Sequence, residues 1–234
     1  MIGLDHLWML AAALAVDALV GDPPALWNRV PHPVTLVGQL IERLDRTLNR
    51  ARARNWLKRT AGILAVAVVI AVSAGVGFAL EYAFSRIPYG WIGIVVVAAI
   101  LLAGRSLYDH VAAVAKAFDS GGLDEARVAV SRIVGRDPAT LDEAGVCRAA
   151  VESSAENFSD GVVAPAFWFA VLGLPGLLAY KALNTADSMI GHQTPRYEHF
   201  GWAAARLDDL ANLPASRLAG ALIAVAAPIV RGSP

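Results

Sequence analysis

The amino-acid sequence predicts an all-α protein, a polytopic membrane helical bundle with amphipathic helices on its cytoplasmic side. Its 234 residues are 56% hydrophobic and 17% charged, with a mean hydropathy of +0.51, which is too apolar for a typical soluble domain. Residues 61–80 contain no charged side chain, and a helix of that length crosses about 30 Å of hydrocarbon. Elsewhere hydrophobic residues recur at helical spacing, and no segment alternates as a strand does.

The apolar segments predict the membrane helices in order. Residues 1–20 predict a first membrane helix, because no basic region precedes the apolar run as it would in a signal peptide. Residues 61–80 and 91–103 predict a helical hairpin, whose second helix reaches spanning length only if it continues toward Leu107. Residues 218–230 predict a short last membrane helix. We therefore expect one integral membrane domain that covers the whole chain.

The distribution of charge predicts the topology. Segment 21–60 carries eight basic and three acidic residues, and the positive-inside rule places it in the cytoplasm. The amino terminus and the turn at 88–90 then lie outside, and the polar stretch 105–160 returns to the cytoplasm. Helical periodicity in that stretch predicts two or three amphipathic helices, broken at Gly121-Gly122 and lying against the bundle.

The overall charge excludes one class of protein. The chain has 20 Lys and Arg residues and 20 Asp and Glu residues, so its net charge is zero. A nucleic-acid-binding protein held by a general basic field is therefore excluded. We expect membrane lipid and no nucleic acid among its partners.

Polar residues gather at both ends of the apolar stretch 161–180. They are Glu152, Glu156, Asn157 and Asp160 before it, and Lys181, Asn184, Asp187 and Ser188 after it. Ionisable groups at the edge of a hydrocarbon layer persist only with partners, so this clustering predicts a functional site. Ordinary helix ends that face water are the alternative.

The two polar groups can share a site only if the apolar stretch folds back. A single crossing would leave them on opposite sides of the membrane. Pro165 and the Leu172-Gly173-Leu174-Pro175-Gly176 segment divide the stretch into halves that are too short to span alone. Irregular backbone at membrane depth is tolerated where protein covers it. We therefore expect an interrupted or re-entrant helix near 161–180, with one kinked span as the alternative.

The residue types on the two flanks predict phosphoryl-group chemistry. At about 100° per residue, the polar residues of the first flank fall within an arc of roughly 140° and most of those of the second flank share one face. Carboxylate and amide oxygens are ligands that magnesium prefers beside phosphate and water. Lysine supplies a compact positive charge for a phosphate group.

Two further groups are weaker candidates. Asp22 and His32 lie in turns bounded by proline, which limits the conformational freedom that they would lose on binding a ligand. A loop that simply caps the next helix is the alternative for His32. Arg136 precedes a helix and could hold a phosphate, although helix capping by Asp137 explains the same turn.

Several long motifs, in a fixed order, resemble the adenosylcobinamide-phosphate synthase family, the membrane proteins of cobalamin biosynthesis of the CobD/CbiB type. The motifs are Gly21-Asp22-Pro23-Pro24, Pro31-His32-Pro33, Gly135-Arg136-Asp137, Glu152-Ser153-Ser154-Ala155-Glu156-Asn157, Asp160-Gly161-Val162-Val163-Ala164-Pro165, Lys181-Ala182-Leu183-Asn184-Thr185-Ala186-Asp187-Ser188-Met189, Phe200-Gly201-Trp202 and Arg206-Leu207-Asp208-Asp209. The resemblance implies a ligase of a bacterial or archaeal cell membrane. It would join aminopropanol, usually as its O-phosphate, to adenosylcobyric acid with ATP and Mg²⁺, and other cobalamin-assembly proteins would be its partners.

With this resemblance we assign three sets of candidate site residues. The catalytic candidates are Glu152, Glu156, Lys181 and Asp187; the substrate- or phosphate-binding candidates are Arg136, Asn157, Asn184, Ser188 and His32; the metal candidates are Asp22 and Asp160. The sequence has no G-x-x-x-x-G-K-[ST] motif, so ATP must be bound in another way than by a P-loop.

Two expectations limit this assignment. Members of the family continue with a polar segment containing Ser-Pro-Asn-Ala-Gly, whereas this sequence stops at Gly232-Ser233-Pro234, so we expect it to lack that segment. A membrane transporter, or a regulatory or assembly protein of the same superfamily without ligase activity, is the alternative function, because such proteins also use charges within the membrane.

Overall fold

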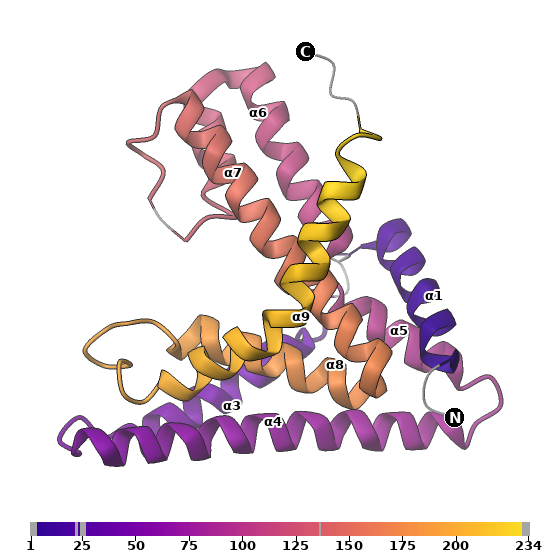
Figure 1. Ribbon diagram of the computed structural model, residues 1–234, viewed down its shortest axis with the longest axis vertical. Helices are drawn as coiled ribbons and strands as arrows, with labels where there is room; N and C mark the ends of the chain where they lie inside the picture. Colours follow the sequence, from indigo (N-terminus) through magenta and orange to yellow (C-terminus); the bar gives the residue numbers. More distant parts are fainter. Residues whose placement is uncertain (1–3, 22, 24–26, 136, 231–234) are drawn as a thin grey trace.

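The computed structural model describes residues 4–21, 23, 27–135 and 137–230, and all regular structure in them is helical. The elements in chain order are α1 (Leu4–Val20), α3 (Pro33–Leu48), α4 (Asn55–Ser85), α5 (Trp91–Leu101), α6 (Gly104–Val130), α7 (Glu143–Phe158), the π-helix η1 (Ser159–Val163), α8 (Ala164–Ile190) and α9 (Trp202–Ala226). The all-α fold class is confirmed. Figure 1 shows α4 as a long rod along one side, with α3, α8 and the first half of α9 against it.

Three helical segments are long and apolar enough to cross a membrane: Asn55–Ser85, Trp91–Val130 and Glu143–Ile190. The chain is therefore a helical membrane protein, as predicted. The expected first and last membrane helices correspond to α1 and to the C-terminal half of α9, and neither helix is among these three segments. In its described part α1 has 17 residues and so extends only about 26 Å.

α8 folds back on itself in the middle. Gly173 has a φ of 67° and interrupts the helical backbone between Ala164–Leu172 and the second half, residues 174–190. The hydroxyl of Tyr180 lies 3.2 Å from the carbonyl oxygen of Asp160, whereas a continuous helix would separate these two residues by about 30 Å. The predicted interrupted helix is thus confirmed, and the alternative of one kinked span is wrong.

A second helix is interrupted where the apolar pattern predicts continuity. α5 ends at Leu101 and α6 begins at Gly104, so the second helix of the hairpin does not run unbroken toward Leu107, although Trp91–Val130 as a whole is long and apolar enough to span. The N–H of Ala103 donates to the carbonyl oxygen of Gly161 in η1 at 3.1 Å. Buried Asp17 of α1 accepts from the N–H groups of Gly104 and Arg105 at 2.9 and 3.2 Å. Tertiary partners therefore satisfy the backbone groups that the break leaves free.

α4 allows two other segments to approach very closely. A Cβ atom on Gly62 would lie 1.8 Å from the carbonyl oxygen of Phe200, just before α9. A Cβ atom on Gly77 would lie 2.7 Å from backbone atoms of Leu174 and Pro175, at the fold-back of α8. Only glycine fits at these two contacts, so α4 positions both the fold-back and the start of α9.

α6 and α7 form the expected amphipathic pair. Gly122, with a φ of 69°, interrupts α6, as the Gly121-Gly122 pair predicts. The two helices bury a small core of their own, formed by Val114, Ala117, Ala126, Val130, Val146 and Ala150. Figure 1 shows the pair projecting away from α4, which differs from the prediction that these helices lie against the bundle, because their apolar faces cover each other.

Candidate functional site

A hydrogen-bonded polar network lies where η1, α8 and α9 meet. Buried Tyr180 donates its hydroxyl to Oδ1 of Asn212 at 2.8 Å. Nδ2 of Asn212 donates to Oδ2 of Asp208 at 2.9 Å, and Nδ2 of Asn184 lies 3.5 Å from Oδ1 of the same carboxylate. Three segments that are distant in sequence therefore contribute to one network, and Asp208 is its centre.

The π-helical turn η1 places Asp160 beside this network. Ser159–Val163 winds more loosely than the helices around it, and Pro165 follows at the start of α8, where the missing N–H of proline costs nothing. The fold-back then brings Tyr180 to the carbonyl oxygen of Asp160. Such π-turns often occur at functional sites, because they redirect one residue without ending the helix.

Acidic groups are concentrated around this point. The charges of Glu156, Asp187 and Lys181 all act on Asp160. Asp208 is only 7% exposed, and its burial, followed by the charges of Asp187 and Asp160, raises its pKa to about 6, although hydrogen bonds from Asn184 and Asn212 oppose the rise. A site of this kind favours a bound cation or a protonated carboxyl group.

Asp160 and Asp187 are the carboxylates of this region that could contribute to a magnesium site. Within the described residues, no group of three His, Cys, Asp or Glu side chains is placed to hold a metal ion. Magnesium, however, commonly takes one or two protein carboxylates and fills its other positions with phosphate oxygens and water. Asp160 and Asp187, which interact electrostatically, can supply those carboxylates.

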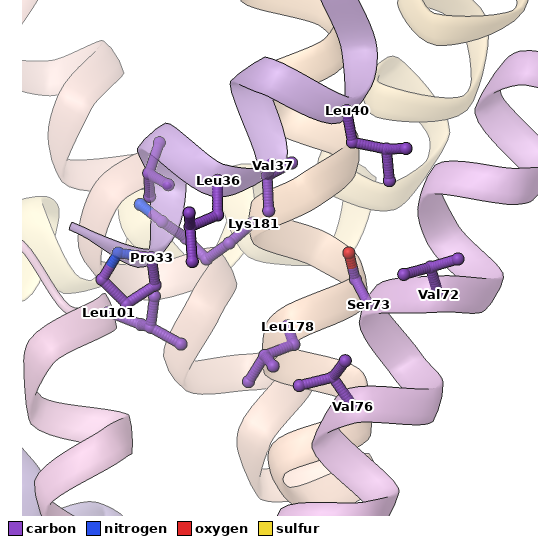
Figure 2. Close-up of a pocket in the computed structure, with 11 residues that line it drawn as sticks. Pro33, Leu36, Val37, Leu40, Val72, Ser73, Val76, Leu101, Leu178 and Lys181 are labelled. Atoms are coloured by element: carbon purple, nitrogen blue, oxygen red, sulfur yellow. The ribbon is translucent and has the colours of Figure 1, made fainter. Parts of the chain in front are cut away.

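Lys181 joins the network to an apolar cavity of about 210 Å³ between α3, α4 and α8. The lining residues are Pro33, Val34, Leu36, Val37, Leu40, Val72, Ser73, Val76, Leu101, Leu178 and Lys181. Figure 2 shows the side chain of Lys181 extending from α8 toward Pro33 at the start of α3. The proline-bounded motif near the amino terminus and the lysine motif of α8 therefore border one cavity, as expected if they serve one site.

The polar residues of α7 are held differently. Glu152, Glu156 and Asn157 are exposed, and Asn157 donates to the carbonyl oxygen and Oγ of Ser153 in its own helix, at 2.8 and 3.0 Å. Ser153 in turn donates to the carbonyl oxygen of Ile133. Glu152 precedes Asp160 by eight residues, or about 12 Å along the helix. Of the predicted first flank, the structure thus brings Asp160 to the second flank, and the charge of Glu156 acts on Asp160.

Other predicted site residues have local partners or cannot be placed. Nδ1 of His32 accepts from the N–H of Val34 at 3.2 Å, which makes His32 the N-cap of α3, as in the capping alternative. Ser188 is exposed and donates to the carbonyl oxygen of Asn184 in its own helix. Asp22 and Arg136 lie outside the described residues. Asp137 accepts from the N–H of Ala139 at 2.9 Å within the turn, but the N-cap of α7 is Asp142, so the alternative of helix capping by Asp137 is wrong.

Sequence reasoning missed Tyr180, Asp208 and Asn212 as site residues. One signal was present: Asp208 and Asn212 are four residues apart on a helix with leucines at 207, 210 and 213, so both polar side chains share one face. That face turned out to be buried against α8.

The fold and the network define an integral membrane protein whose polar site is built at a folded-back helix. The comparisons with known proteins narrow this class. A family model described as CobD/Cbib protein matches residues 10–232, and the chain belongs to the CobD/CbiB family.

Three relatives illustrate the match. The chain is 57% identical over 228 residues to the cobalamin biosynthesis protein CobD of Sinorhizobium sp, covering 97% of this chain and 71% of the relative. It is 56% identical to that of Sinorhizobium fredii (96% and 69% covered) and 50% identical to that of Rhodobacter capsulatus (94% and 69% covered). No solved structure shows a significant match.

Proposed function

We propose that the chain acts in cobalamin biosynthesis as an ATP-dependent amide ligase that joins aminopropanol, or its O-phosphate, to a propionate carboxylate of adenosylcobyric acid. The family and the names of the relatives support a role in this pathway. The observation that carries the ligase assignment is the fold-back of α8, which brings Lys181 and Asp187 close enough to Asp160 for their charges to act on it. Phosphate-binding and metal-binding side chains thereby share one site.

The reaction requires activation of the carboxylate, because an oxide ion is a poor leaving group. A carboxylate oxygen attacks the γ-phosphorus of ATP, ADP leaves, and an acyl phosphate forms. The amine then attacks the acyl carbon, inorganic phosphate leaves, and a base takes the proton that the nitrogen loses. The protein must therefore hold the phosphates, balance their charge and align the amine with the acyl group.

The side chains of the network divide these tasks. Lys181 binds the transferred phosphate, since its ammonium group provides a compact positive charge. Asp160 and Asp187 would hold the Mg²⁺ of the nucleotide, which neutralises phosphate charge when bound. Asn184 and Asn212 hold Asp208 in place through their amide donors. Asp208, with a pKa of about 6, is a suitable base for the amine proton near neutral pH.

The exposed carboxylates of α7 complete the proposed site. Glu152 and Glu156 lie on the turns that lead into η1, where they can contact a corrinoid or amine substrate that approaches from solvent. The positive-inside rule places this approach on the cytoplasmic face of the cell membrane, because segment 21–60 and the α6–α7 pair share that side in the predicted topology.

Substitution of Lys181 tests the proposal. We expect Lys181→Met to lower ATP-dependent amide formation about 1,000-fold, as for loss of a positioned charge at a transferring phosphoryl group, with unchanged insertion into membranes. Lys116→Met is the matched control, because Lys116 is exposed on α6. The measurement is amide product formed from adenosylcobyric acid, aminopropanol phosphate and Mg·ATP in membranes that contain equal amounts of each variant.

Two results would contradict the proposal. Near-normal turnover by the Lys181→Met protein would remove this lysine from the site. If the wild-type chain binds the corrinoid but neither consumes ATP nor restores corrinoid-dependent growth to a synthase-deficient cell, the ligase assignment fails and the transporter or regulatory class is favoured.

A further inference from the structure

A carboxylate from α4 caps the fold-back of α8. Oε2 of Glu81 accepts a hydrogen bond from the N–H of Leu174 at 2.9 Å, and Oε1 of the same side chain lies 3.2 Å from Nε2 of His6. Leu174 directly follows Gly173, whose φ of 67° interrupts α8. Glu81 therefore binds the first amide of the second half of the helix from a different helix.

The physical chemistry of the break explains why a carboxylate is placed there. A helix that starts anew leaves its first N–H groups without intrahelical acceptors, and an apolar environment makes such groups costly. Pro175 has no N–H to lose, so Leu174 carries the first donor that needs a partner. A negative charge at this position also interacts favourably with the helix dipole.

The surrounding side chains fit Glu81 closely. A Cβ atom at position 173 would lie 2.5 Å from Oε2 of Glu81, so the carboxylate can reach the turn only because residue 173 is glycine. Gly77, one turn before Glu81, lets α4 reach the backbone of Leu174 and Pro175. His6 also packs against Phe169 of the first half of α8, with ring centroids 5.7 Å apart. The Glu81–His6 pair thus contacts both halves of the folded helix.

We propose that Glu81 is a positioning residue, which sets the register of the second half of α8 and through it the placement of Lys181, Asn184 and Asp187. Lys181 is seven residues, or about 10 Å, beyond Leu174, and a slip of one residue would rotate it by about 100°. The predicted effect on turnover rests on the proposed ligase function, whereas the predicted effect on helix geometry does not.

A distance measurement tests the geometric part. Spin labels are attached at Val151 and Met189, which are 70% and 37% exposed, in a Cys147→Ala background. A straight helix over these 38 residues would separate the labels by roughly 57 Å, and the fold-back makes the distance much shorter. We expect one narrow, short distance for the wild type and for Glu81→Gln, whose amide oxygen can still accept from Leu174, and a broadened, longer distribution for Glu81→Ala.

Kinetics tests the positioning part. We expect Glu81→Ala to lower kcat for amide formation by about tenfold or more, because small displacements of catalytic groups have effects of this size. The shape of its pH profile should stay unchanged, since Glu81 is not expected to exchange protons with substrate. Glu81→Gln should remain within about threefold of the wild type. Glu198→Ala, at an exposed glutamate in the loop after α8, is the control and should leave both measurements unchanged.

The outcomes separate the two proposals. If Glu81→Ala retains a narrow, short distance and normal kcat, Glu81 does not position α8. If Glu81→Gln loses activity as Glu81→Ala does while both keep the short distance, its charge has a chemical role and the positioning proposal is wrong. If the wild type forms no amide but the distances change as expected, the ligase assignment fails and the role of Glu81 stands. Should Glu81→Ala fail to reach the membrane, Glu81→Asp replaces it, because its shorter side chain ends one methylene group away from Leu174, and the same changes are expected.

Discussion

The two flanks of the fold-back in α8 are equally rich in polar residues, but the protein holds them in different ways. On the α8–α9 side, Asp208 is buried and bonded to Asn184 and Asn212 across two helices. On the α7 side, Glu156 is exposed. Polar side chains of the site are therefore held in place by hydrogen-bond partners on other helices, and the number of polar residues in a segment of sequence does not reveal such partners.

The largest expected contrast is between two neighbouring aspartates of α9. Asp208→Ala should lower the rate of amide formation about 100-fold or more, because it removes the acceptor at the centre of the network. Asp209→Ala should change the rate less than about threefold, since exposed Asp209 pairs with Arg206 at the surface at 3.6 Å and acts on Asp187 through its charge alone. Initial rates at equal membrane content measure both. Equal losses from the two variants would show that burial does not distinguish the flanks.

A pH profile sharpens the same contrast. Because burial raises the pKa of Asp208 to about 6, its ionised form is lost as the pH falls, and kcat/KM should decrease about tenfold between pH 7.5 and pH 5. The contribution of this group to stability has the opposite sign. A carboxyl group with a raised folded-state pKa stabilises the fold most at low pH, and this contribution is lost as the pH rises toward and through 6. Asp208→Asn should remove this acidic limb; its persistence would assign the limb to another group.

The exposed flank should respond in activity without responding in stability. Glu156→Gln is expected to lower kcat about tenfold, as for loss of a charge that helps to align the amine substrate, with a thermal unfolding midpoint in detergent that matches the wild type. The substitution should leave stability unchanged, because the side chain of Glu156 is exposed and contributes little packing. A rate within about twofold of the wild type would restrict the site to the α8–α9 side.

The smallest effect is expected at the end of α8. Ser188→Ala removes a hydroxyl that bonds only within its own helix in the structure, so turnover should change by less than about twofold and stability by less than about 0.5 kcal/mol. Rates and chemical denaturation measure these quantities. A loss of tenfold or more would restore Ser188 as a phosphate-binding residue and extend the site along α8.

The sequence was sufficient for features that depend on local backbone chemistry. Gly173 and Pro175 predicted the interruption of α8, because glycine adopts a positive φ easily and proline starts a helix without needing an acceptor. Gly121-Gly122 predicted the interruption of α6 for the same reason. The fold-back also brings Lys181 close enough to Asp160 for its charge to act there, and the roles of both residues in the site stay predictions.

Features created by contacts between helices could not be predicted from the sequence. The apolar run through Leu101 and Leu102 gives no sign of the break before Gly104, which depends on the carboxylate of Asp17 and the carbonyl oxygen of Gly161. The role of Asp208 depends on how α9 is rotated against α8. His32 is the N-cap of α3, the alternative that the sequence left open, and its role as a binding residue stays a prediction. The placement of Asp22 and Arg136 stays a prediction.

Two glycines of α4 contact the backbone of other segments and so fix two positions along this helix. Gly62 and Gly77 are fifteen residues apart, which corresponds to about 22 Å along the rod and to only about 60° around it. Gly77 sets where α8 folds back, and Gly62 sets where the chain enters α9. Insertion of a single residue between the two glycines would rotate one contact by about 100° relative to the other. The number of residues in this interval, more than their identity, therefore fixes how α8 and α9 lie relative to each other at the polar network.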